Sequence, residues 1–597
     1  MDYYIPNGGI YTAPKNIVKD AKLIKWLSFD EFCEFSNLGI MDVNHETASF
    51  FKQKNIEIRI NDILKIENPS TIISNNPIYN KNELIKGITY QENIAIISVT
   101  GVLIKRNSSA VRRIFSTVAD LEVSILFISQ SSSEQTVSFG INLCYADLIY
   151  QKLLSVFRFE FEQLLLSAIE VSKNVCIILA IGNNMDNNRG IAGKIFSAIA
   201  SRNINVKSIS QDSNERSISI AIDKKDLENA VQYLSHVFFN TMLDIEIFLF
   251  GIGTIGSCLL NIIKNQKYQF LQYGYNLKVI GISRSKVMLI DNKGIELSDW
   301  RNRFDHEAVS FDCSNIDYII NYEYRKYNSI FIDCTTSPEV AEKYVSLLEN
   351  GYNIITANKK ANSMNYEYYK KIRATADEKK LKFLYETNVG AGLPIIYTLQ
   401  SIYARGDEIK SFYGIMSGSL SFIFGKLEEG YSFSEAVFEA KKIGFTEPDP
   451  RDDLNGMDIA RKGLIIAREC KNKLELSDVT IQSIFPKDFD LSGTTDEFLR
   501  KLPQIDEYFQ QRINKLKINK QVLKMAVVYE NNQVSVKLLE VDENHPLYNI
   551  KNGENAFVFY TKNCKEIPIT VQGYGAGAEV TATGMYGDLC RILNSYK

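Results

Sequence analysis

The chain has 597 residues, of which 45% are hydrophobic, 23% charged and 11% aromatic, so we expect several folded domains and no extended disorder. The 68 lysines and arginines almost balance the 71 aspartates and glutamates. The resulting net charge of −3 gives no reason to expect a nucleic acid or an anionic membrane as a partner.

The residues that report on the cellular compartment favour the cytoplasm. The nine cysteines form no CxxC pair and only four histidines occur, which argues against a disulfide framework and against a zinc site. The first residues lack the basic and apolar regions of a signal peptide, and no apolar run approaches the ~20 residues that span a bilayer.

A repeat occupies residues 89–240. The stretch NIAIISVTG from Asn93 aligns with NVCIILAIG from Asn174 at an offset of 81 residues, and the polar stretches QSSSE and QDSNE, which begin at Gln130 and Gln211, also align. The apolar spacing of each copy predicts a strand, a glycine turn, a helix, a strand, a polar turn and a strand. Two copies are too few for a solenoid, so we expect a pair of small domains packed together.

The pattern of this repeat resembles the ACT domain, a βαββαβ module that binds amino acids between paired copies. The resemblance implies a regulatory role for residues 89–240 and assigns effector contacts to Gln130 and Gln211. The alternative is that both glutamines only stabilise a β-turn. Duplication of the whole polar loop favours the effector-binding interpretation.

A dinucleotide-binding fold is predicted over residues 243–375. The apolar strand 245–250 leads directly into a G-x-G-x-x-G motif, and Leu259, Leu260 and Ile263 predict a helix after it. Glycines at these positions permit a tight turn and a close approach of a pyrophosphate to the helix N-terminus. The expected cofactor contacts in this motif are Gly251, Ile252, Gly253, Thr254, Ile255 and Gly256.

The ends of three later strands supply further candidate contacts. Strand 277–282 is followed by Arg284 and Lys286, where an NAD-preferring fold usually has an acid for the ribose 2′-hydroxyl, so we expect NADPH rather than NADH. The alternative role of Arg284 is that of a solvated charge at a strand end. Two more strands lead into Thr335 and Lys359, which we expect near the cofactor because ligands collect at the carboxyl edge of such a sheet.

Residues 440–462, AKKIGFTEPDPRDDLNGMDIARK, hold the densest cluster of charged side chains. Asp458 and Lys462 are four residues apart and share one face of a predicted helix. Read alone, this is a surface ion pair, but Ile459 and Leu464 indicate that the helix is partly buried. A lysine beside a carboxylate in a partly buried cleft is a good proton donor to a carbonyl that is being reduced.

The same segment resembles the signature of homoserine dehydrogenases. Further motifs of that family occur in order from about residue 245 to the C-terminus: the glycine motif, CTTS, TANKKA, ETNVGAGLP, GIMSGSLSFIF and GYGAGAEVTATGMYGDL. The resemblance implies the reversible reduction of L-aspartate 4-semialdehyde to L-homoserine with NADPH, in threonine and methionine biosynthesis.

The expected fold class is α/β. The ACT-like βαββαβ pair precedes a Rossmann-type dinucleotide-binding domain, and an α+β domain for catalysis and dimerisation follows over residues 376–565. The resemblance implies that the last segment, residues 566–597, returns to the nucleotide-binding domain.

The resemblance also assigns roles to individual side chains. Lys462 matches the family's proton donor, and Lys359 matches a second lysine close to the reacting centre. An acid that faces the ammonium group of a zwitterionic substrate makes electrostatic sense. The residues that match substrate contacts are Glu447, Asp453 and Asp458, and the further expected cofactor contacts are Gly444 and Gly577.

The stretch ETNVGAGLP resembles the monovalent-cation loop of this family. The implied ligands are the Glu386 side chain and the backbone carbonyls of Val389, Ala391 and Leu393. A ligand set made of oxygens suits a hard cation such as Na⁺. The alternative is a glycine-rich turn that binds no ion.

Residues 1–88 precede the repeat. An ACT pair followed by a dehydrogenase resembles bifunctional aspartokinase–homoserine dehydrogenases, and GGIYTAPKNIVKDAKLIKWLSFDEFCEFSNLGI resembles the end of their kinase domain. The family's Tyr-Thr-Thr-Asp-Pro-Arg reads YTAPKN here, and Met41–Thr47 departs from the family pattern as well. We therefore expect a truncated, degenerate kinase remnant, which packs on the ACT pair or serves in assembly, and no aspartokinase activity.

The resemblance further implies threonine as the effector and a homo-oligomer, either a dimer or a tetramer. Two other functions fit the sequence: a non-catalytic amino-acid-binding regulator with a decayed dehydrogenase half, and an oxidoreductase with a different substrate. The intact dehydrogenase motifs argue against the regulator.

Overall fold

The computed structural model of the chain forms two compact units, Met1–Leu243 and Asp244–Lys597. The structure describes residues 1–5, 8–36, 45–63, 70–77, 85–106, 108–130, 135–182, 185, 190–211, 216–311, 317–320 and 328–596. The polar loops at 131–134 and 212–215 and most of the segment Met41–Thr47 lie outside these ranges.

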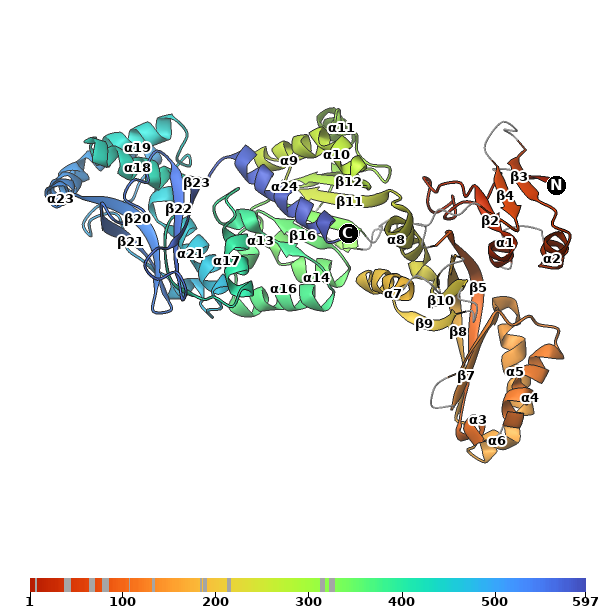
Figure 1. The fold of residues 1–597 in the computed structure, drawn as a ribbon. Helices are drawn as coiled ribbons and strands as arrows, with labels where there is room; N and C mark the ends of the chain where they lie inside the picture. The colour runs from red at the N-terminus through yellow and green to blue at the C-terminus, as the bar shows by residue number, and fades with distance from the viewer. Residues whose placement is uncertain are drawn as a thin grey trace. The chain divides into compact units, whose positions relative to one another are not determined.

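The first unit begins with a four-stranded sheet in the order β1-β3-β4-β2. Its elements are β1 (Asp2–Ile5), β2 (Trp26–Ser28), α1 (Phe29–Ser36), α2 (His45–Gln53), β3 (Ile58–Asp62) and β4 (Thr71–Ser74) (Figure 1). Phe29, Phe32 and Phe35, three residues apart on α1, are buried in one core with Ile177 and Leu179 of the repeat. The N-terminal segment therefore packs on the sheet of the repeat.

The two copies of the repeat share a single six-stranded sheet in the order β6-β7-β5-β8-β10-β9. Its strands are β5 (Gly87–Thr100), β6 (Phe127–Gln130), β7 (Thr136–Asn142), β8 (Ala168–Ile181), β9 (Val206–Gln211) and β10 (Ser217–Asp223). The accompanying helices are α3 (Val102–Arg106), α4 (Ser108–Ala119), α5 (Ala146–Val156), α6 (Arg158–Glu162), α7 (Ile191–Ser201) and α8 (Leu227–Phe239).

The long strands β5 and β8 interlock the two copies. Residues 87–91 of β5 pair with residues 177–181 of β8, while residues 94–100 pair with residues 168–175. The register shifts near Asn93, which has a φ of 59°, and Asn174 has a φ of 60°. Asparagine tolerates this left-handed conformation better than most residues, which explains why both copies carry it at the same place.

The second unit begins with a seven-stranded sheet in the order β14-β13-β12-β11-β15-β16-β17, in which β11, β15, β16 and β17 run parallel. Its strands are β11 (Leu243–Phe250), β12 (Tyr275–Arg284), β13 (Val287–Ile290), β14 (Val309–Ser310), β15 (Ser329–Asp333), β16 (Asn353–Thr356) and β17 (Phe383–Leu384). Helices α9 (Thr254–Asn265) and α24 (Ala578–Asn594) lie side by side over one face, and α14 (Tyr344–Glu349) and α16 (Tyr366–Glu378) cover the other (Figure 1). The remaining helices of this domain are α10 (Lys267–Gln272), α11 (Trp300–Glu307), α12 (Asp317–Ile320), α13 (Pro338–Ala341) and α15 (Lys360–Ser363).

The same unit contains a six-stranded sheet in the order β19-β21-β20-β18-β22-β23. Its strands are β18 (Ile409–Ile415), β19 (Thr480–Ile481), β20 (Gln521–Glu530), β21 (Gln533–Asp542), β22 (Glu554–Thr561) and β23 (Ile569–Tyr574). The helices are α17 (Ile395–Ala404), α18 (Gly418–Glu429), α19 (Phe433–Lys442), α20 (Arg451–Leu454), α21 (Met457–Glu469), α22 (Thr495–Lys501) and α23 (Asp506–Ile518). Helices α18, α21 and α23 pack on β20, so the predicted α/β class with an α+β second domain is confirmed.

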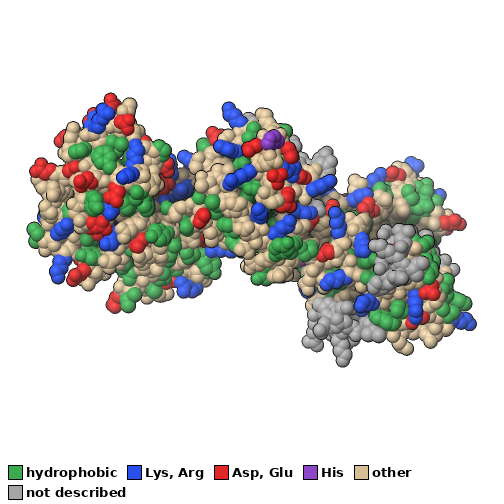
Figure 2. Space-filling model, turned by 90° about the horizontal axis from the view of Figure 1, so that it is seen from above, with side chains coloured by type: hydrophobic (Ala, Val, Ile, Leu, Met, Phe, Trp, Pro, Cys, Tyr) green, Lys and Arg blue, Asp and Glu red, His purple; other side chains and the backbone are tan. Residues whose placement is uncertain are grey.

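The distribution of surface charge and the length and polarity of the helices agree with the expectations from composition. Basic and acidic side chains are interspersed over the described residues on the face that Figure 2 shows. Within the described ranges, every helix is too short or too polar to cross a bilayer.

Candidate active site

The glycine motif forms the turn between β11 and α9. Gly251 has a φ of +89°, and a Cβ there would lie 2.8 Å from the backbone carbon of Cys334. A Cβ on Gly256 would lie 2.2 Å from the carbonyl oxygen of Gly251, whereas a Cβ on Gly253 would meet no atom within 4 Å. The first and third glycines are therefore required by packing, and the second leaves the space before the α9 N-terminus open for a phosphate.

The predicted 2′-phosphate contacts lie next to this turn. The backbone N–H groups of Gly251 and Ile252 donate to the carbonyl of Ser283, at 2.9 and 3.1 Å. Arg284, which follows Ser283 directly, and Lys286 are both exposed on the turn between β12 and β13. This exposure fits either contact with a cofactor or solvated surface charges.

A buried carboxylate shapes the strand ends around Thr335. Asp333, at the end of β15, accepts hydrogen bonds from the Thr335 N–H (2.7 Å), the Tyr344 hydroxyl (2.6 Å) and the Asn358 side-chain amide (3.1 Å). Burial raises the pKa of Asp333, although these hydrogen bonds oppose the rise. The group ties the loop after β15 to the loop that carries Lys359. The sequence analysis missed it, and its position just before CTTS was the available signal.

Two lysines and one aspartate meet between α15 and α21. Lys462 Nζ donates to Asp458 Oδ2 at 2.8 Å and to the carbonyl of Met416 at 2.7 Å. Lys359 Nζ lies 3.7 Å from Asp458 Oδ1, so the carboxylate stands between the two ammonium groups. The exposed fractions of the Lys462, Lys359 and Asp458 side chains are 12%, 32% and 53%.

Burial and the mutual charges of this cluster shift the pKa values of Lys359 and Asp458. Burial lowers the pKa of Lys359, and the Lys462 ammonium lowers it further, although Asp458 opposes both effects. Partial burial would raise the pKa of Asp458, but the two ammonium groups outweigh it and hold that pKa below its ordinary value. Asp458 is therefore a carboxylate at neutral pH, and Lys359 loses its proton more readily than an ordinary lysine.

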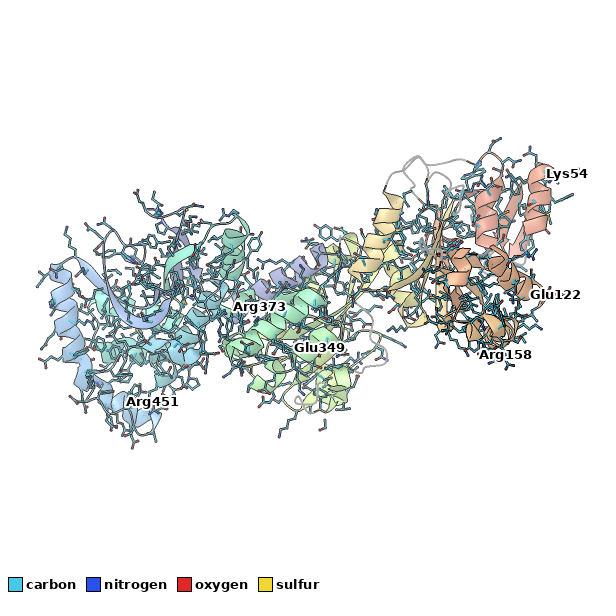
Figure 3. All side chains as sticks on the ribbon, turned by 90° about the horizontal axis from the view of Figure 1, so that it is seen from below. Lys54, Glu122, Arg158, Glu349, Arg373 and Arg451 are labelled. Atoms are coloured by element: carbon cyan, nitrogen blue, oxygen red, sulfur yellow. The ribbon has the colours of Figure 1, made fainter. Side chains whose placement is uncertain are left out.

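The acidic loop before α21 is held by its own carboxylates. Asp453 Oδ1 accepts from the Ser419 hydroxyl at 2.7 Å, and Asp453 Oδ2 accepts from the Glu447 N–H at 2.8 Å. The Glu447 side chain is exposed, and Asp449 forms an ion pair with Arg451, which Figure 3 labels. Both Asp453 oxygens are thus engaged, and burial raises its pKa. Ser419 is a further residue that the sequence analysis did not single out.

The two remaining glycines expected near the cofactor also have open surroundings. Gly444 follows α19 with a φ of +77°, and Gly577 precedes α24 with a φ of +112°. A Cβ on either would meet no atom within 4 Å.

In the expected cation loop, the Glu386 carboxylate binds protein N–H groups. Glu386 is buried and accepts from the N–H of Ile396 at 2.8 Å and of Tyr397 at 3.1 Å, and from Arg591 Nη1 at 2.9 Å. The carboxylate therefore caps α17 and neutralises Arg591.

The backbone of this loop is tightly turned. Ala391 adopts a φ of +52° directly after Gly390 at +78°, and the carbonyl of Leu393 accepts from the Ile395 N–H at 2.9 Å. The carbonyl oxygens suit a hard cation by type. Three N–H donors engage the Glu386 carboxylate, so a cation at this loop would share that carboxylate with them. Among the described residues, no three His, Cys, Asp or Glu side chains are grouped to hold a metal ion.

The two candidate effector residues end equivalent strands. Gln130 is the last residue of β6 and Gln211 the last of β9, and both are exposed. These strands are at opposite ends of the sheet order, yet they contact each other. By strand register, Gln130 is level with Val99 of β5, whereas Gln211 is level with Ile88, so the two glutamines stand toward opposite ends of the strands.

Family models match most of the chain. A model described as homoserine dehydrogenase matches residues 394–590, one described as the NAD-binding domain of homoserine dehydrogenase matches residues 251–386, and an ACT domain model matches residues 97–153 and 178–238.

Individual proteins show the same similarity. A bifunctional aspartokinase/homoserine dehydrogenase of Buchnera aphidicola is 40% identical over 98% of this chain and 72% of its own length, and that of Haemophilus influenzae is 39% identical over the same shares. A homoserine dehydrogenase of Schizosaccharomyces pombe is 34% identical over 59% of this chain and 96% of its own length. A crystal structure of a Candida auris protein of unknown function covers 59% of this chain and 98% of its own, with 32% identity and a TM-score of 0.54.

Proposed function

Since the chain belongs to the family of bifunctional aspartokinase/homoserine dehydrogenases, we propose that Lys462, Lys359 and Asp458 carry the proton chemistry of its dehydrogenase reaction. The chain is a homoserine dehydrogenase with an NAD-binding domain and ACT domains. The proposed reaction is the reversible reduction of L-aspartate 4-semialdehyde to L-homoserine with NADPH. The absence of kinase activity stays a prediction.

Lys462 is the proposed proton donor. A bound NADPH supplies the hydride that reduces the aldehyde carbon. The Lys462 ammonium has three N–H donors, of which two bind Asp458 and the carbonyl of Met416. The third can hold the substrate's carbonyl oxygen and transfer a proton to it. Lys359, on the other side of Asp458, adds a second positive charge that stabilises the developing alkoxide.

The substrate's ammonium group calls for an acid that is still free to bind it. Glu447 is exposed, and its backbone is fixed by Asp453 at 2.8 Å. We propose that Glu447 binds the ammonium group and that Asp453 acts mainly by orienting Glu447 and Ser419. This narrows the substrate-binding role that the sequence resemblance implies for Asp453.

NADPH is the proposed cofactor because the β12–β13 turn offers cations where an NAD-preferring fold has an acid. Arg284 and Lys286 are exposed there, and the hydrogen bonds of Ser283 hold this turn next to the glycine motif. The remaining proposed contacts are Gly253, Thr335, Gly444 and Gly577.

Threonine is the proposed effector of the ACT pair. The support is the match to the ACT domain and the equivalent places of Gln130 and Gln211, each the last residue of its strand. Because the amides of both glutamines are exposed, they can hydrogen-bond the carboxylate or hydroxyl of a bound amino acid.

A bound Na⁺ is a further proposal, and it rests on the backbone carbonyls of one loop. The carbonyls of Val389, Ala391 and Leu393 are the proposed ligands, and a cation at this loop would compete with Arg591 for Glu386. An assay in sodium chloride and in choline chloride tests this, since equal activity and thermal stability in both salts would exclude a required Na⁺.

A homo-oligomer in the cytoplasm completes the proposal. Tyr574, on the edge strand β23, is 67% exposed, and Ile567, two residues before that strand begins, is 83% exposed. This edge therefore offers apolar surface to a second copy. All eight cysteines in the described residues are free, as in a reducing compartment.

The observation that carries the proposal is the carboxylate of Asp458 between two lysines at the carboxyl edge of the nucleotide-binding sheet. The test is NADPH oxidation by the pure protein with aspartate 4-semialdehyde, with and without millimolar threonine. Turnover that threonine reduces is expected. No turnover by folded protein would favour the non-catalytic regulator, and turnover that threonine leaves unchanged would remove only the regulatory part.

A further inference from the structure

The last turn of α21 is bound to the nucleotide-binding domain by a fully buried arginine. The Arg468 side chain is 0% exposed, and its Nη1 donates to the carbonyls of Asn362 (3.0 Å) and Met364 (2.7 Å). Its Nε donates to the carbonyl of Leu474 at 3.0 Å, and its Nη2 pairs with Glu475 at 3.0 Å. The guanidinium fork thus joins three backbone carbonyls and a carboxylate at once.

The neighbouring residue, Glu469, strengthens this joint. Its Oε1 accepts from the Tyr385 hydroxyl at 2.6 Å, the Tyr369 hydroxyl at 3.0 Å and Arg373 Nη2 at 3.1 Å. Arg373, on α16, also donates to the side chain of Asn362 at 3.1 Å. Figure 3 shows Arg373 where the nucleotide-binding domain meets the catalytic domain.

The partners of Arg468 lie at one end of α15, and a catalytic lysine lies at the other. Lys359 directly precedes α15, whereas Asn362 and Met364 lie at its C-terminal end. The helix has 4 residues, so at ~1.5 Å per residue it is about 6 Å long. It runs beside α21, with Lys359 near Asp458 of the first turn and Asn362 near Arg468 of the last. A shift at the Arg468 end therefore moves Lys359.

We propose that Arg468 is a positioning residue for the lysine pair: by holding the end of α15 against α21, it sets where Lys359 stands relative to Asp458 and Lys462. The inference rests on the proposed function of these lysines. A lysine at position 468 keeps the charge but presents a single ammonium group, which does not span the four acceptors that the planar fork of arginine reaches.

The test compares Arg468→Lys and Arg468→Met with the wild type in the full chain. We expect kcat to fall by about 10-fold or more, and further in Arg468→Met, with the KM for NADPH within about threefold, because a misplaced reacting group costs rate rather than cofactor affinity. In a Lys359→Ala background, Arg468→Lys should cost almost nothing more, because the residue through which it acts is absent.

A matched control separates positioning from stability. Lys524 is another buried cation of this unit, which pairs with Glu428 and donates to the carbonyl of Ile550 at 2.6 Å. Lys524→Met should lower the melting temperature comparably and leave kcat within about twofold. An unchanged kcat in Arg468→Lys, an equal loss in Lys524→Met at matched folded fraction, or a loss that persists in the Lys359→Ala background would overturn the inference.

A readout without turnover keeps the inference distinct from the proposed function. Acylation of Lys359 by acetic anhydride, followed by mass spectrometry, reports how accessible its amine is. We expect faster labelling of Lys359 in Arg468→Lys than in the wild type, because the loosened α15 relieves its burial. If the wild type turns over no substrate, the proposed function fails, and equal labelling in both proteins would then overturn the positioning role as well.

Discussion

The two ends of α21 carry the same kinds of charge in opposite settings. Near the N-terminus, Asp458 of the first turn is 53% exposed, and Lys462, one turn later, keeps one N–H donor for a ligand. In the last turn, Arg468 is 0% and Glu469 8% exposed, and protein groups bind the Arg468 guanidinium and Glu469 Oε1. Exposed charges with a free donor are suited to bind and react, whereas buried charges that are bonded to protein groups hold two domains together.

The largest effect is expected at the first turn. Asp458→Asn leaves Lys359 and Lys462 as two ammonium groups without their shared carboxylate, so we expect kcat to fall by about 10²–10³-fold. Because Asp458 is half exposed, the free energy of unfolding should change by no more than about 1 kcal/mol. Steady-state kinetics and thermal unfolding measure both, and a kcat within threefold of the wild type would remove Asp458 from the site.

At the last turn, the larger expected effect is on stability. Glu469→Gln leaves the guanidinium of Arg373, which is 24% exposed, without its carboxylate partner. Breaking a buried pair in this way should lower the free energy of unfolding by about 3 kcal/mol, measured by urea denaturation. A loss below about 1 kcal/mol would show that the two tyrosines and Asn362 hold the joint without the charge.

The pH dependence of the first turn has a definite sign. Burial lowers the pKa of Lys359 and Asp458 raises it, so removal of the carboxylate should lower that pKa further. Reduction needs protonated lysines, so the rate should fall on the alkaline side below the ordinary lysine pKa of about 10.4. In Asp458→Asn this alkaline limb should move to lower pH. A limb that stays in place, or moves to higher pH, would show that Lys359 does not set it.

The smallest effects are expected in the glycine motif, where one glycine serves cofactor binding and another serves packing. Gly253 faces open space, so Gly253→Ala should raise the Kd for NADPH by about 10-fold and leave the melting temperature unchanged. In Gly256→Ala, a Cβ would lie 2.2 Å from a carbonyl oxygen, so overpacking of about 1–3 kcal/mol should destabilise the domain instead. Fluorescence titration and thermal unfolding check the pair, and a reversed pattern would refute the assignment.

Local spacing predicted the first turn of α21 but not its last turn. Asp458 and Lys462 are four residues apart, and this spacing alone predicts the ion pair that is found at 2.8 Å. Arg468 and Glu469 look like the polar end of a helix in the sequence. Their partners lie up to 106 residues away along the chain, so the spacing of residues within the helix could not predict these contacts. The apolar residues Ile465 and Ile466 beside them were a local sign that this end lies inside the protein, and both are buried in the structure.

Contacts between residues that are distant in the sequence were also not predicted for Glu386 and for the repeat. The resemblance implies a cation-ligand role for Glu386, and it gave no sign of the ion pair with Arg591, which is 205 residues away. Within the repeat, self-similarity predicted two modules, and the left-handed φ of Asn93 and Asn174 explains one of the identities. The way β5 and β8 serve both copies could not be predicted, because strand pairing is a long-range property.

The central claim is that Lys462 supplies the proton for an NADPH-dependent reduction. The most direct measurement is the kcat of Lys462→Ala with aspartate 4-semialdehyde, together with its Kd for NADPH. We expect kcat to fall by about 10³-fold or more with the Kd within about threefold, since the lysine acts only on the reacting oxygen. A kcat near that of the wild type, or a loss of NADPH binding instead, would contradict this account.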